Sequence, residues 1–160
     1  KNQLTKLIDA ELAKGVPVMV QNPFHSISDE EMLKQKLDKQ ISKYFLYRLD
    51  AGLTKSIQFN ADNLWKLPIM LDSNITVHLL LKRVNIFSDD FKAMTDKGPL
   101  KYKKGVHFRG IVQEWNNSTA AISVFDDNIS GFKNKEKILI ENFSIKIIMY
   151  YLSVYNCLFQ

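Results

Sequence analysis

The sequence of 160 residues is poor in cysteine, glycine and proline and has no long apolar run, and each shortage excludes a class of protein. Its single cysteine, Cys157, excludes an internal disulfide framework and a zinc site built from several cysteines. Six glycines and four prolines do not fit a collagen-like repeat. No segment reaches the roughly 18 apolar residues that cross a bilayer, since Lys146 interrupts the nearest one, residues 143–159. We therefore expect no membrane span.

The start of the chain lacks the charged and apolar regions of a secretory signal, so no signal peptide is visible. Because the sequence begins at Lys1 and not at a methionine, we expect either that a leader has been removed or that the sequence is an excerpt of a longer protein.

The composition is that of a globular protein with a real core. Hydrophobic residues make up 46% and charged residues 24% of a length close to one domain. Ten phenylalanines, six tyrosines and two tryptophans also speak against disorder. The net charge of +5 comes from scattered basic residues, so we expect no nucleic-acid partner.

Helical patterns are confined to the first 43 residues. Apolar residues at helical spacing predict a short helix over 3–14, stopped by Gly15. Residues 16–20 suit an edge strand or an extended linker. A capping box that begins at Ser28 predicts a second helix over about 29–41.

Short strands dominate from Tyr44 onward, and they predict a mainly β fold. The expected architecture is an antiparallel β-sandwich or meander preceded by one or two short N-terminal helices. We expect a hairpin around residues 72–74 and a bend or bulge near Lys82 and Arg83 in its long second strand. The expected strands are 44–49 (closed by a turn at 50–52), 56–60, 67–71, 75–87, 106–113, 119–125 and 129–132, with a loop at 95–99 and turns at 114–117 and 126–128.

A set of short motifs lies in order along the second half of these strands. The pieces are His107-Phe108-Arg109-Gly110, Asn117-Ser118, Ala121-Ile122-Ser123 and Gly131-Phe132. In order and spacing they resemble the N-terminal propeptide domain of secreted zinc metalloproteases of the reprolysin (adamalysin, ADAM-like) type, closest to the bacterial secreted members. The match lies mainly in residues 82–132.

Elementary chemistry gives these motif residues structural roles. Phe108, Ile122 and Val124 alternate with polar residues and form one buried face. Gly110 permits close backbone approach or a bulge. Side chain to backbone hydrogen bonds of Asn117 and Ser118 suit a turn.

Gly131 is expected where φ is positive or a side chain would clash. We expect His107 to be a half-buried sheet residue rather than a metal ligand or a base.

The sequence departs from the family pattern toward its end. Propeptides of this type often carry a zinc-ligating cysteine in a Pro-x-x-Cys-Gly-like segment, and Cys157 has neither the proline before it nor the glycine after it. No zinc-switch cysteine is therefore expected here. We predict three parts: a helical and extended segment over 1–43, a propeptide-like β-domain over 44–142, and an apolar tail over 143–160, which is native or a truncation or frame-shift product.

Catalytic and metal-binding patterns are missing from the sequence. The three histidines, His25, His78 and His107, form no H-E-x-x-H helix motif. Asp89-Asp90 and 126–128 lack the order of a calcium loop and read as turns, and residues 101–104 read as a solvated loop. We expect no catalytic residues, no metal and no cofactor.

The resemblance implies a non-catalytic propeptide domain in a secreted precursor, with the metalloprotease catalytic domain as its partner in cis. Its implied role is to assist folding of the protease domain and to keep it latent. We expect contact through sheet edges and through the loops at 89–102 and 116–117. The alternative is an extracellular β-sandwich adhesion or ligand-binding module, which an exposed aromatic strip of Trp65, Trp115 and Tyr102 would favour. A small enzyme is the least favoured reading.

Overall fold

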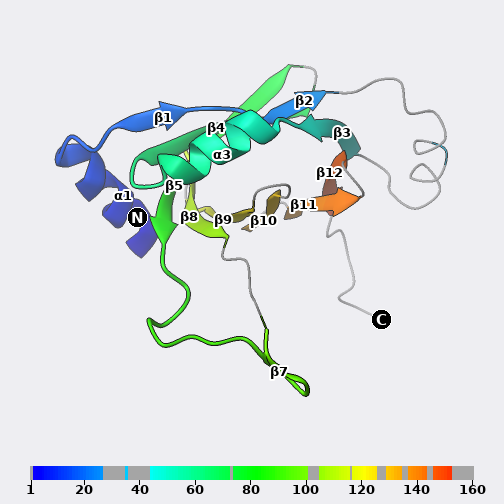
Figure 1. Ribbon diagram of the computed structural model, residues 1–160. Helices are drawn as coiled ribbons and strands as arrows, with labels where there is room; N and C mark the ends of the chain where they lie inside the picture. The colour runs from blue at the N-terminus through cyan, green and yellow to red at the C-terminus, as the bar shows by residue number, and fades with distance from the viewer. Residues whose placement is uncertain are drawn as a thin grey trace, which may run out of the picture.

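A computed structural model (Figure 1) describes residues 2–26, 35, 44–72, 74–100, 105–115, 117–125, 129–134, 137–143 and 146–152. These residues are mainly in strands, which confirms the mainly β fold class. The helices are α1 (Gln3–Ala13) and α3 (Ala51–Phe59). The strands are β1 (Val18–Val20), β2 (Phe24–Ser26), β3 (Tyr44–Leu49), β4 (Leu64–Asp72), β5 (Ile75–Val84), β6 (Met94–Thr95), β7 (Gly98–Pro99), β8 (Val106–Val112), β9 (Thr119–Val124), β10 (Ile129–Asn134), β11 (Lys137–Phe143) and β12 (Lys146–Leu152).

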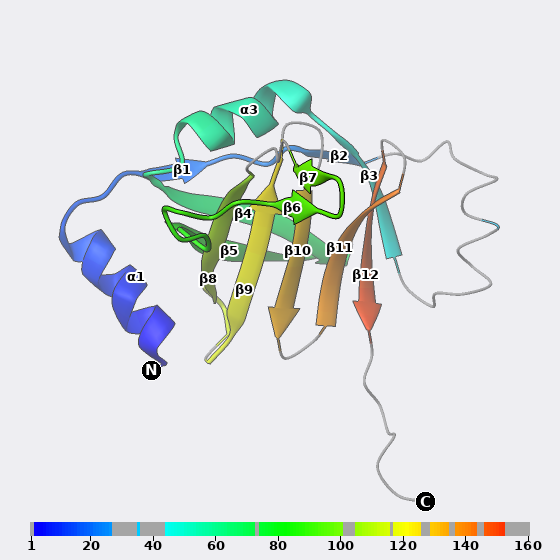
Figure 2. The same ribbon diagram turned by 60° about the horizontal axis from the view of Figure 1, so that its bottom comes forward.

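One large sheet contains ten of the strands, in the order β1-β4-β5-β8-β9-β10-β11-β12-β3-β2. Strands β8 to β12 form an antiparallel meander in which each strand pairs with the next, and they lie side by side in Figure 2. Only the pair β1 and β4 is parallel among the described strands of this sheet. The expected meander is therefore present.

The two ends of the sheet are formed by one short stretch of chain. β1 and β2 are the first and last strands of the sheet order, yet only residues 21–23 separate them in sequence. The Trp65 indole N–H donates to the carbonyl of Gln21 at 2.9 Å, and the Asp50 amide donates to the carbonyl of Pro23 at 2.8 Å. The sheet must curl so that this stretch can reach both of its ends (Figure 1).

The main core lies on the face of the sheet that α3 covers. Ile57 of α3, Trp65 of β4 and Leu81 of β5 are fully buried there, beside Phe108 of β8. The rings of Trp65 and Phe108 meet edge to face, with centroids 5.2 Å apart. Burial of several large apolar side chains is the main stabilising contribution to the fold.

A smaller core lies on the opposite face, under α1. Ile8 of α1 is fully buried and belongs to one cluster with Leu64 and Leu80, and Ile111 packs at its edge. Leu80 and Leu81 are consecutive in β5, so they point to opposite faces of the sheet. The sheet thus carries a helix on each side, and we call the face under α1 the outer face.

The first predicted helix is confirmed. Asn2 is its N-cap, since its side-chain oxygen accepts from the Thr5 amide at 2.8 Å, and Gly15 follows its last turn with φ of 75°. The expected edge strand is β1. The helix expected over 29–41 lies outside the described residues, apart from residue 35, which is helical.

The strand predicted over 56–60 is wrong, because residues 51–59 form α3. Asp50 caps this helix by accepting from the Leu53 amide at 2.9 Å, so residues 50–52 begin a helix and do not form a simple turn. Thr54 and Ile57 are buried three residues apart, whereas Phe59 is 91% exposed. The period-two spacing of Ile57 and Phe59 was the misleading signal, since a helix places the two on different faces.

The hairpin predicted around residues 72–74 is confirmed as β4 and β5. The irregularity lies between Met70 and Asp72, and not near Lys82 and Arg83, which pair in continuous register with Arg109 and Phe108. A bulge beside the turn adjusts the twist of the hairpin and leaves the rest of β5 regular.

The strands predicted over 106–113, 119–125 and 129–132 are confirmed as β8, β9 and β10. The loop expected at 95–99 is part of a small hairpin, because the two-residue strands β6 and β7 pair with each other. Within residues 143–160, β12 pairs with both β11 and β3. The domain boundaries stay a prediction. No helix in the described part of the chain is long and apolar enough to cross a membrane.

Candidate functional site

The motif residues come together on the β8–β9 hairpin. Their register pairs His107 with Ser123, Phe108 with Ile122 and Arg109 with Ala121. Alternation along the strands divides them into a core-facing half and a half on the outer face. Gly131 and Phe132 lie in β10, in register with Ile122 and Ala121 of β9.

The core-facing half has the structural roles that the sequence indicated. Phe108, Ile122 and Val124 are all buried in the main core. A Cβ atom on Gly110 would collide with the backbone carbonyl of Leu80, so close backbone approach is the reason for glycine here.

The turn between β8 and β9 depends on Asn117 and Ser118. Asn117 has φ of 58°, a conformation that asparagine tolerates better than most residues. The buried Ser118 hydroxyl accepts from the Val112 amide at 2.9 Å and lies 2.9 Å from the carbonyl oxygen of Trp115. The side chain of Asn2 donates to the Ser118 carbonyl at 3.2 Å, so the N-cap residue of α1 is hydrogen-bonded to this turn.

His107 lies in a sheet strand, as predicted, but it is buried rather than half-buried. Its side chain is 9% exposed, and Nδ1 lies 2.8 Å from the Ser123 hydroxyl. Nε2 is buried without a hydrogen-bond partner, and the rings of Phe87 and Phe125 pack edge to face against the imidazole. Burial lowers the pKa of His107, because the charged imidazolium is poorly solvated there.

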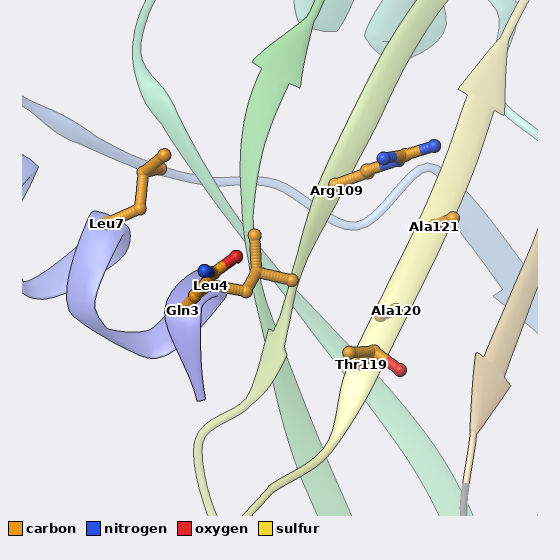
Figure 3. Close-up of a pocket in the computed structure, with 7 residues that line it drawn as sticks. All are labelled: Gln3, Leu4, Leu7, Arg109, Thr119, Ala120 and Ala121. Carbon is orange, nitrogen blue, oxygen red and sulfur yellow. The ribbon is translucent and has the colours of Figure 1, made fainter. Parts of the chain in front are cut away.

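A groove of about 430 Å³ opens on the outer face beside these residues, between α1 and the β8–β9 hairpin (Figure 3). In Figure 3, Leu4 points from α1 toward β8, and the Arg109 side chain extends from β8 toward β9. The groove is lined by Gln3, Leu4, Leu7, Arg109, Thr119, Ala120 and Ala121. We call it the α1 groove.

The charges around the α1 groove are unevenly balanced. Lys82 stands opposite Arg109 in the register of β5 and β8, and its ammonium group pairs with Glu11 of α1 at 2.8 Å. Hydrogen bonds from Lys82 and Lys14 lower the pKa of Glu11. Among the described residues, Arg109 has no ion-pair partner.

A second hollow, of about 600 Å³, lies beside His107 at the end of β5. Its lining includes Asp62 and Arg83, which form an exposed ion pair at 3.2 Å. The other lining residues come from 84–89 and from 105–107.

The other candidate positions are placed apart from the groove. His25 lies 3.3 Å from Asp50, and His78 Nδ1 lies 2.6 Å from Glu114. In the part of the chain that the structure describes, no three histidine, cysteine, aspartate or glutamate side chains gather where a metal ion could bind.

Asp89 and Asp90 form the expected turn, closed by the Phe91 amide on the Ser88 carbonyl at 3.1 Å. The Ser88 hydroxyl donates to Asp90 and lowers the pKa of its carboxyl. The candidate cation turn at 126–128, the basic residues 101–104 and Cys157 lie outside the described residues.

The aromatic strip that would favour an adhesion module is not formed as expected. Trp65 is fully buried in the main core, and Trp115 is half-buried against it. Tyr102 lies outside the described residues. The two tryptophans therefore do not favour the alternative of an adhesion or ligand-binding module, which rests on fold analogy.

Sequence reasoning did not find the α1 groove. The two walls of the groove are about one hundred positions apart in the chain. The apolar face of α1 predicts only that the helix packs against another part of the protein, without saying which part. The resemblance drew attention to Arg109 and Ala121, and the structure adds Leu4 and Leu7 opposite them. Comparison with protein-family models, with curated proteins and with solved structures gave no match.

Proposed function

We propose that this chain is a non-catalytic propeptide-like domain of a secreted reprolysin-type zinc metalloprotease precursor. One observation carries the proposal: the separate motif pieces of β8 and β9 form one hairpin in unbroken register. The core-facing half of this hairpin accounts for Gly110 and for the apolar motif residues. Arg109 and Ala121, on its outer half, line the α1 groove. A surface of that kind suits binding to another domain, and no chemistry within this chain is required.

The mechanism is binding to one state of the protease domain. A domain that binds the native, inactive protease but not the unfolded chain stabilises that state by mass action. When both domains belong to one polypeptide, the effective concentration is in the millimolar range for a short flexible linker, so modest affinity suffices. Cleavage of the connection lowers that concentration and releases the active protease.

The test uses this chain and the reprolysin-type catalytic domain encoded together with it. We expect the purified chain to inhibit cleavage of a fluorogenic peptide in a saturable manner and to raise the yield of active protease on refolding. An unrelated protein of similar size and net charge serves as the control for non-specific effects. Absence of both measurable affinity and inhibition would contradict the proposal.

A further inference from the structure

We propose that the α1 groove receives an extended segment of the protease domain whose aspartate or glutamate side chain pairs with Arg109. The identity of the partner rests on the function proposed above, whereas the chemistry of the segment follows from the groove itself.

The charge argument concerns the two strand neighbours of Arg109. On β5 it faces Lys82, and like charges opposite each other in a sheet repel. On β9 it faces Ala121, which offers no counter-charge. Glu11 is bound to Lys82 and Lys14, so among the described residues the guanidinium of Arg109 has no carboxylate partner. A carboxylate from a partner would relieve this excess of positive charge.

The shape argument concerns the walls on either side of that charge. Leu7 is 44% exposed and Leu4 lines the same side, so α1 offers apolar contact that a partner can bury. Ala121 lines the opposite wall, and its small side chain leaves room for a partner chain to approach β9 closely. A volume of about 430 Å³ accommodates a few residues of extended chain. We therefore expect small apolar side chains beside the acidic one.

The groove is held open by contacts outside it. Ile8 fixes α1 on the outer face, and the Asn2 side chain binds the Ser118 carbonyl at the end of the hairpin. A groove that exists before binding costs less conformational entropy when it is filled. Arginine suits this position because its planar guanidinium can hold a carboxylate through two parallel hydrogen bonds.

The decisive variant is Arg109→Glu, with Lys55→Glu as its matched control. Both change the net charge by the same amount, but Lys55 is exposed on α3, which covers the other face of the sheet. Arg109 is also exposed, and a glutamate there would face Lys82, so we expect Arg109→Glu to fold normally by circular dichroism. Affinity for the catalytic domain is measured by isothermal titration calorimetry or by inhibition.

We expect Arg109→Glu to weaken binding by about tenfold or more, and Lys55→Glu by less than about twofold. Replacing the contacting acidic residue of the protease by arginine should restore binding to Arg109→Glu. If wild type binds and both variants bind equally well, or lose affinity equally, the groove inference is overturned while the proposed function stands. If the wild-type chain does not bind at all, the proposed function itself fails.

Discussion

Gly110 lies where β8 passes β5 so closely that a Cβ atom would meet the backbone of Leu80 and Leu81. The obstacle is main chain in the middle of a sheet, so it cannot rotate away as a flexible side chain would. Gly110→Ala must therefore spread the two strands or distort their hydrogen bonds.

We expect Gly110→Ala to lower the free energy of unfolding by about 3 kcal/mol, the upper part of the range for overpacked cores. Urea denaturation monitored by tryptophan fluorescence measures it. Gly15→Ala is the control, because a Cβ atom there meets nothing within 4 Å and only the positive φ of 75° is penalised. We expect about 1 kcal/mol for that control. A loss at Gly110 no larger than at Gly15 would count against the close approach.

His107 makes stability depend on pH. Burial lowers its pKa in the folded state, so below the ordinary value of 6.5 the unfolded chain binds more protons than the folded one. The contribution of His107 to stability is therefore complete above that value and is lost progressively as the pH falls toward its folded-state pKa.

We expect the free energy of unfolding of wild type to fall from about pH 8 to about pH 5, and His107→Phe to remove part of that dependence. The phenyl ring suits the site, because Phe87 and Phe125 already pack on the imidazole. His25→Gln replaces an exposed histidine, and it should leave unchanged the part of the pH dependence of stability that His107 causes. Parallel pH curves for wild type and His107→Phe would show that this histidine is not the cause.

Among the elements, α1 buries one residue completely against the sheet. Ile8 is fully buried against the outer face, whereas Leu12 on the same helix is 42% exposed. We expect Ile8→Ala to cost about 2–5 kcal/mol and Leu12→Ala less than about 1 kcal/mol, measured by urea denaturation. Hydrogen exchange in α1 should quicken in Ile8→Ala. Equal effects of the two variants would mean that α1 is not anchored through Ile8.

The elements also show how far sequence patterns reach. The α1 helix and the hairpins β4–β5 and β8–β9 were predicted, because their apolar residues repeat with a clear period and their ends carry turn or cap residues. The α3 helix was missed, because its nine residues give less than three turns of pattern and Ser56 to Asn60 also alternates. The only signal for the start of this helix was Asp50, whose side chain accepts a hydrogen bond from the Leu53 amide three residues later.

At the scale of the whole molecule, the candidate site depends on contacts that no local pattern contains. The groove needs α1 beside β8 and β9, and the pairing of Glu11 with Lys82 joins residues far apart in sequence. Trp65 was considered for an exposed strip and lay outside the strand predicted over 67–71, whereas β4 begins at Leu64 and carries Trp65 into the core. Which face of a strand is buried follows from the register, and the register follows from the complete sheet.

The curled sheet also has a consequence for the order in which the molecule can be made. β3 is translated about one hundred positions before its sheet neighbour β12. Until then β3 can pair only with β2, and one edge of a half-built sheet stays open to wrong partners. Such distant pairing slows folding, so we expect this sheet to mature only after β12 has been translated and to gain from chaperones in the meantime.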